Sequence, residues 1–206
     1  MTIFRNVVFL AALAGLIGGV FLSAVQAFQT TPLIIHAETF EGDDEEEHDD
    51  EAAGHAHAHD EEAWMPEDGF ERFFYTSLAN IVTAIGFALL LVVASEFAGG
   101  IANWREGLFW GLGGFAVFTL APGLGLPPEL PGMPAADLVA RQVWWIATAA
   151  LTAGGLWLLV FKRSAALAVA GVVLIVAPHF VGAPHPESHD TLVPADLHHQ
   201  FVVAVT

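Results

Sequence analysis

Apolar residues gather in five runs along the chain, with shorter polar stretches between them. A helix needs about 20 mostly apolar residues to cross a bilayer, and each run approaches that length. The pattern predicts membrane-spanning helices at residues 7–28, 78–97, 107–126, 143–161 and 165–181. Pro178 and His179 interrupt the last run, which is the weakest of the five. Another apolar run opens at 201–206, where the chain ends, so we expect a further span to begin there.

Composition agrees with this pattern. The chain has 206 residues, of which 55% are hydrophobic and 14% are charged, whereas a typical soluble domain carries about 25% charged residues. We therefore expect an all-α, polytopic membrane protein. Its length fits a single membrane domain, 1–206.

The first run could also be a cleaved signal peptide, since one basic residue precedes it and small residues follow it. Its apolar length exceeds the usual ~7–15 residues of a signal core. Ala11, Gly15 and Gly19 recur at every fourth position, which gives a helix a face suited to close packing in lipid. These observations favour a retained membrane helix.

Basic residues set the orientation, because Lys and Arg concentrate in cytoplasmic loops. With a cytoplasmic N-terminus, four of the six basic residues lie inside: Arg5, Arg105, Lys162 and Arg163. Arg72 and Arg141 lie outside. We expect a bacterial inner-membrane protein whose first loop is periplasmic.

The acidic residues are concentrated in one place. Of the 23 Asp and Glu residues, 16 lie between positions 38 and 71, and most of these fall in the segment 41–62. With the predicted orientation, all ten histidines also lie on the outer side. The same segment 41–62 contains four of them: His48, His55, His57 and His59.

This composition favours metal capture. Neutral imidazole is a common ligand of divalent transition metals, and carboxylates add oxygen donors. His55, His57 and His59 alternate with alanine, so they share one side of an extended segment. So many like charges predict a flexible outer loop that concentrates cations without forming a rigid cage. The alternatives are a solvated spacer or a pH-responsive segment.

A second group of candidate ligands flanks the spans. His36 and Glu38 follow the first span, while His179, His185 and Glu187 lie at the end of the fifth. Ionisable groups near membrane depth are costly and indicate function. We expect His36 and His179 to lie close together at an outer pore mouth. The alternative is that both only cap helix ends.

A proline-rich outer segment, 121–142, separates the third and fourth spans. Five prolines rule out a regular helix through much of it. Asp137 and Arg141 have the spacing of a helical ion pair, and Trp144 with Trp145 would suit the membrane interface. We interpret these residues as architecture and not as ligands.

Several function classes are disfavoured by what is missing. The chain has no cysteine and only six basic residues, so thiolate metal sites and nucleic-acid binding are not expected. It contains no phosphate-binding P-loop and no zinc-protease or hydrolase motif. We expect no catalytic centre and no tightly bound cofactor.

Three stretches carry a resemblance to a known family: "EEAWMPEDGFER", "LAPGLGLPPELPGMPAADLVARQVWW" and "APHFVGAPHPE". With them the chain resembles the CbtA family of probable cobalt transporter proteins over nearly its whole length. The resemblance implies a bacterial membrane protein of several spans, linked to cobalt uptake and cobalamin synthesis. It also implies a small one-span partner with its own histidines.

The leading hypothesis is a membrane subunit for uptake of Co²⁺, with the loop as the capturing element. A second hypothesis is a membrane metal sensor or buffer that does not transport, and a third is a scaffold whose acidic loop docks a basic partner. Ni²⁺ and Zn²⁺ accept the same donors, so the residues alone do not select among the three metals.

Overall fold

The computed structural model describes residues 2–40, 66–188 and 190–205, and within these ranges every regular element is helical. The chain divides into two compact units, unit 1 from Met1 to Gly100 and unit 2 from Ile101 to Thr206. Each unit is described by itself. The expectation of one membrane domain therefore stays a prediction.

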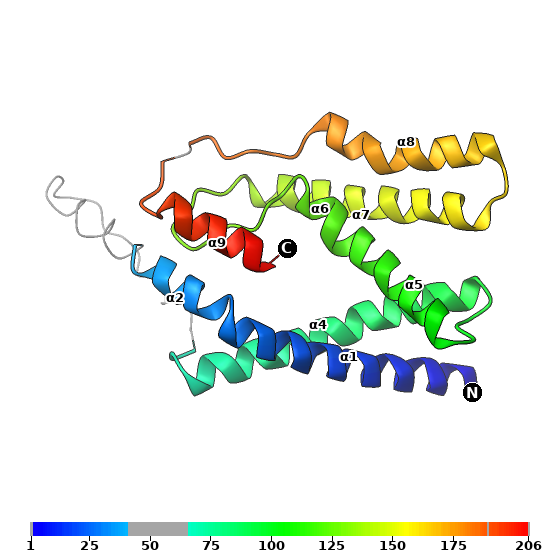
Figure 1. Ribbon diagram of the computed structural model, residues 1–206, viewed down its shortest axis with the longest axis horizontal. Helices are drawn as coiled ribbons and strands as arrows, with labels where there is room; N and C mark the ends of the chain where they lie inside the picture. The colour runs from blue at the N-terminus through cyan, green and yellow to red at the C-terminus, as the bar shows by residue number, and fades with distance from the viewer. Residues whose placement is uncertain (1, 41–65, 189, 206) are drawn as a thin grey trace, which may run out of the picture. The chain divides into compact units, whose positions relative to one another are not determined.

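The described part of unit 1, residues 2–40 and 66–100, contains two long helices and one short helix (Figure 1). The long helices are α1, Thr2–Phe28, and α4, Phe70–Phe97. The short helix α2, Thr31–Glu38, follows α1 after a brief turn. Large apolar side chains such as Phe9, Phe21 and Val82 are exposed along α1 and α4. In a soluble protein such a surface would be unfavourable, whereas hydrocarbon accepts it.

The predicted small-residue face of α1 is confirmed. Ala11, Gly15 and Gly19 are all buried, and α1 packs on α4 through them. A Cβ added to Gly15 would stand 2.5 Å from the Cα of Ile85, and one added to Gly19 would stand 2.5 Å from the Cα of Ile81. The two backbones can approach this closely only because these positions carry no side chain.

Unit 2 contains the remaining helices. They are α5 Trp104–Phe115, the π-helical turn η1 Ala116–Leu120, α6 Ala121–Gly123, α7 Leu138–Phe161, α8 Ala165–Val181 and α9 Ala195–Val205. Asn103 caps α5, because its side-chain oxygen accepts hydrogen bonds from the backbone N–H groups of Arg105 and Glu106. The third predicted span is thus a helix with a π-turn inside it.

Helices α7 and α8 lie side by side in unit 2 (Figure 1) and are joined by the turn 162–164. Gly155 of α7 and Gly171 of α8 are both buried at their contact. A Cβ on Gly155 would stand 2.5 Å from the backbone oxygen of Gly171. Small residues therefore set this contact as they set the one in unit 1.

The proline-rich segment contains no helix between α6 and α7, as predicted. The expected ion pair between Asp137 and Arg141 was wrong. Arg141 pairs with Glu129 at 3.1 Å, while the side chain of Asp137 caps α7 by accepting from the N–H of Ala140. Trp144 is buried against Gly125, and the interface role of Trp144 and Trp145 stays a prediction.

Three helices of the described ranges are long and apolar enough to cross a membrane: Phe4–Phe28, Phe70–Phe97 and Leu138–Phe161. Helix α8 is apolar but has only 17 residues. An all-helical membrane fold is confirmed for the described residues, whereas the predicted count of five spans is not.

Candidate metal-binding site

The segment expected to capture metal lies outside the described residues. It includes His48, His55, His57 and His59. The chain on either side of it is described, namely the end of α2 and the start of α4. These two ends show how the segment is attached to unit 1.

Glu38 and Arg72 join the two ends. The guanidinium of Arg72 donates two parallel hydrogen bonds to the carboxylate of Glu38, at 2.6 and 3.0 Å. It also lies 3.3 Å from a carboxylate oxygen of Asp68. This bidentate geometry fixes the orientation of both groups as well as attracting them. Glu38, predicted as a metal ligand, therefore has a cationic partner already.

His36 is exposed on α2, and its ring lies 5.6 Å from that of Phe40. Positions two apart on a helix point in different directions. The imidazole of His36 is accordingly separate from the Glu38–Arg72 pair. It could bind an ion without disturbing the pair, whereas Glu38 could not.

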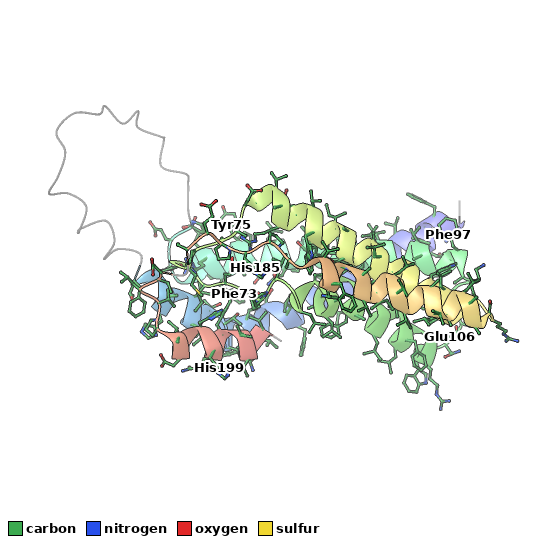
Figure 2. All side chains as sticks on the ribbon, turned by 90° about the horizontal axis from the view of Figure 1, so that it is seen from above. Phe73, Tyr75, Phe97, Glu106, His185 and His199 are labelled. Atoms are coloured by element: carbon green, nitrogen blue, oxygen red, sulfur yellow. The ribbon has the colours of Figure 1, made fainter. Side chains whose placement is uncertain are left out.

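The other candidates belong to unit 2. His179 is half-buried in the last turn of α8, with its ring 5.9 Å from that of Trp144 and nearly perpendicular to it. His185 and Glu187 are exposed on the segment between α8 and α9, where Figure 2 labels His185. In unit 2, His179 thus packs against an aromatic ring while the other two project from an extended segment.

Two further histidines have different surroundings. The imidazole Nε2 of His198 lies 3.3 Å from the carbonyl oxygen of Pro128, which links α9 to the proline-rich segment. The hydroxyl of Thr191 donates to the carbonyl of Gly132 in the same segment. His199, labelled in Figure 2, is exposed on α9. His198 therefore has an architectural role.

Within the described ranges, no three His, Asp or Glu side chains are gathered as a metal site. His36 and Glu38 lie in unit 1, and His179, His185 and Glu187 lie in unit 2. The proposed proximity of His36 and His179 stays a prediction.

Unit 1 also has a pocket of about 280 Å³ between α1, α2 and the first turns of α4. Six polar side chains line it: Gln26, Thr30, Thr31, Arg72, Thr76 and Asn80. The amide nitrogen of Asn80 donates to Ser23 Oγ at 3.1 Å and to Gln26 Oε1 at 2.6 Å. Sequence reasoning missed this pocket, although Arg72, Thr76 and Asn80 recur at every fourth position.

The comparison with protein families decides what kind of protein this is. The family model described as "Probable cobalt transporter subunit (CbtA)" matches residues 4–206. The chain belongs to the CbtA family. No curated protein and no solved structure matches it significantly.

Membership of the CbtA family agrees with the long apolar helices of the fold, which suit a membrane-embedded subunit of a transporter. The description also names a subunit, which implies that a CbtA protein works together with other chains. It suggests transport and not catalysis.

Helix α7 of this CbtA protein carries a polar row that sequence reasoning did not single out. Trp144, Thr148 and Thr152 are spaced four residues apart and are all buried. The indole nitrogen and both hydroxyls have no hydrogen-bond partner among the described residues. The signal that could have found this row is the i, i+4, i+8 spacing of polar side chains in an apolar span.

Proposed function

We propose that the chain is the membrane subunit of a Co²⁺ uptake system and that its acidic, histidine-rich segment 41–62 captures the ion. Membership of the family of probable cobalt transporter subunits carries this proposal. The residues of the segment support it, because imidazole and carboxylate together suit a divalent transition metal.

The captured ion would pass to ligands at the ends of the spans. In unit 1 these are His36 and Glu38, and in unit 2 they are His179, His185 and Glu187. Glu38 has to exchange its partner Arg72 for the metal. A site that forms only by exchange can release the ion again, as transport requires.

Energy would come from a partner or from the membrane potential, because the chain has no nucleotide-binding motif. A potential that is negative inside favours inward movement of a cation by about 2.3 kcal/mol per charge per 100 mV. The inward direction requires the proposed orientation, with segment 41–62 in the periplasm and the N-terminus in the cytoplasm. The partner that we propose is a small one-span protein with its own histidines.

Reconstitution in proteoliposomes tests the function. Vesicles that contain the chain and its partner, with a potential negative inside, should accumulate radioactive Co²⁺ faster than vesicles with the chain alone. Ni²⁺ and Zn²⁺ added as competitors would rank the three metals. Saturable Co²⁺ binding without accumulation would contradict transport and favour the alternative, a membrane metal sensor or buffer.

A further inference from the structure

Trp144 lies where the chain after α6, the start of α7 and the end of α8 come together in unit 2 (Figure 1). The residue is only 9% exposed. A Cβ added to Gly125 would overlap its indole ring and would stand 3.2 Å from the Cβ of Ala183, so these three residues meet at one place. Gly125 belongs to the proline-rich segment, and Ala183 follows α8. Two segments that are distant in the sequence therefore pack around one tryptophan.

The indole of Trp144 also contacts the imidazole of His179. The two ring centroids are 5.9 Å apart, and the ring planes meet at 73°. Aromatic pairs prefer this edge-to-face arrangement at centroid distances of roughly 4.5–7 Å. No hydrogen bond from another described residue fixes the ring of His179. Among the described residues, the indole is thus the contact that restricts how this imidazole turns.

A histidine that binds a metal has to present one ring nitrogen in a defined direction. The last torsion of a histidine side chain has a broad energy profile, so the ring turns easily when nothing holds it. In most metal sites the second ring nitrogen donates to a carboxylate or a carbonyl group, and this bond fixes the direction of the first. The described residues give His179 no such partner, whereas the packed indole can restrict the same rotation.

We propose that Trp144 is a positioning residue for His179, which holds the imidazole with one nitrogen toward the approaching ion, and that Gly125 keeps the indole in place. The inference rests on the proposed function, in which His179 is a ligand of the captured ion. It gives the proline-rich segment a role in metal binding that acts through Trp144.

Titration of the full chain with Zn²⁺ in nanodiscs tests the positioning role. Zn²⁺ accepts the same donors as Co²⁺ and is diamagnetic, so it shifts the NMR signals of its ligands without broadening those of distant groups. The ring signal of His179, in protein with ¹³C-labelled histidine, is assigned by its loss in His179→Asn. The Zn²⁺ concentration at half of the shift measures binding at this ring.

Loss of the aromatic contact should raise this half-shift concentration. Trp144→Leu should raise it about two- to ten-fold, as expected when an aromatic pair is lost. Trp144→Phe keeps an aromatic ring, and the indole N–H that it removes has no partner among the described residues. It should therefore lie closer to the native chain. Trp145→Leu is the matched control, because Trp145 stacks on Phe118, and it should leave binding at His179 unchanged.

Two glycine variants test the contact without replacing the indole. Gly125→Ala places a methyl group against Trp144 and should raise the half-shift concentration in the same direction as Trp144→Leu. Gly123→Ala adds the same methyl group where it meets nothing within 4 Å and should have no effect. Neither glycine has a positive φ, so the two variants differ in what the methyl group meets. This pair decides by itself if Trp144→Leu does not fold.

Equal effects of Trp144→Leu and Trp145→Leu, or of the two glycine variants, would overturn the proposal. A native His179 signal that Zn²⁺ does not shift would also overturn it, even if proteoliposomes with the native chain accumulate Co²⁺. The expected order of the variants in a protein that accumulates no Co²⁺ would support the positioning role while contradicting the proposed function.

Discussion

Arg72 holds Glu38 in a bidentate ion pair although 34 positions separate them in the chain. The segment predicted to capture metal lies between them, so one pair joins both of its ends. Both side chains are about a quarter to a third exposed. The pair is therefore expected to contribute only about 0–1 kcal/mol to stability. Its main effect would be on the availability of the Glu38 carboxylate.

Opposite changes to the pair should have opposite effects on metal uptake. Arg72→Gln frees Glu38 and should lower the Co²⁺ concentration at half-maximal uptake, whereas Glu38→Gln should raise it. A purely structural pair would impair uptake in both variants. Arg141→Gln is the matched control, because it breaks the pair with Glu129, which is similarly exposed. It should leave the half-maximal Co²⁺ concentration unchanged. Initial rates of Co²⁺ uptake into proteoliposomes give this concentration for each of the three variants.

The contact between α1 and α4 should be intolerant of a single methyl group. Gly19→Ala places a Cβ against the backbone of Ile81 and should destabilise the protein by about 1–3 kcal/mol. Gly18→Ala, one position earlier, meets nothing within 4 Å and should be neutral or slightly stabilising. Thermal unfolding in detergent compares them. Similar melting temperatures for both variants would contradict the close approach of the two helices.

The histidines of segment 41–62 should matter mainly when metal is scarce. Replacing His55, His57 and His59 together by Asn should raise the half-maximal Co²⁺ concentration and leave the maximal rate unchanged, because the segment only raises the local ion concentration. His199→Asn, at an exposed position of α9, is the control. Loss of transport at saturating Co²⁺ would show instead that the segment is an obligatory site.

The same capture predicts a pH dependence. Metal binds neutral imidazole, and ordinary imidazole becomes protonated as the pH falls through about 6.5. Uptake at low Co²⁺ should decline over this range in the native chain and decline less in the triple variant.

The buried hydroxyls of α7 should be dispensable for stability. Thr148→Val and Thr152→Val each remove a hydroxyl without a partner among the described residues, and a buried unpaired hydroxyl costs about 1–3 kcal/mol. Each variant should melt at the same temperature as the native chain or higher. Thr119→Val, at an exposed position of η1, should change little. Destabilisation by about 1 kcal/mol or more would indicate hydroxyls that bind internal water.

The proposed meeting of His36 and His179 can be tested by cross-linking, since the chain contains no cysteine. Two nitrogen ligands of one ion lie within roughly 5 Å of each other, given bonds of ~2.1 Å. The double variant His36→Cys with His179→Cys should react with a short bismaleimide to give an internal cross-link, and Co²⁺ should protect the corresponding native residues from modification. Failure of every short reagent to link the pair would remove the shared site.

Sequence patterns predicted the apolar helices well, because hydrophobic runs and small-residue spacing are local signals. The α1 face with Gly15 and Gly19 is an example. The start of α4 was placed at position 78, whereas the helix begins at Phe70. The prediction followed the apolar run, which begins at position 78, and the pairing of Arg72 with Glu38 became visible only in the fold.

Side-chain partners were harder to predict because they depend on how distant segments meet. The spacing of Asp137 and Arg141 suggested a helical pair, but Asp137 is the N-cap of α7, and the loop brings Glu129 to Arg141. The capping role was readable from an acidic residue before an apolar run. The polar pocket had no such local signal, since three separate helices build it.

The π-turn Ala116–Leu120 accommodates one more residue than an α-helical turn would, as the hydrogen bond from the N–H of Ala121 to the carbonyl of Ala116 shows. An α-helix advances by about 100° per residue. One extra residue in an unbroken α-helix would therefore rotate the chain beyond it by that angle, whereas the wider π-turn absorbs the residue within itself. The helix thus carries one residue more without turning Pro122 away from the side on which it is buried.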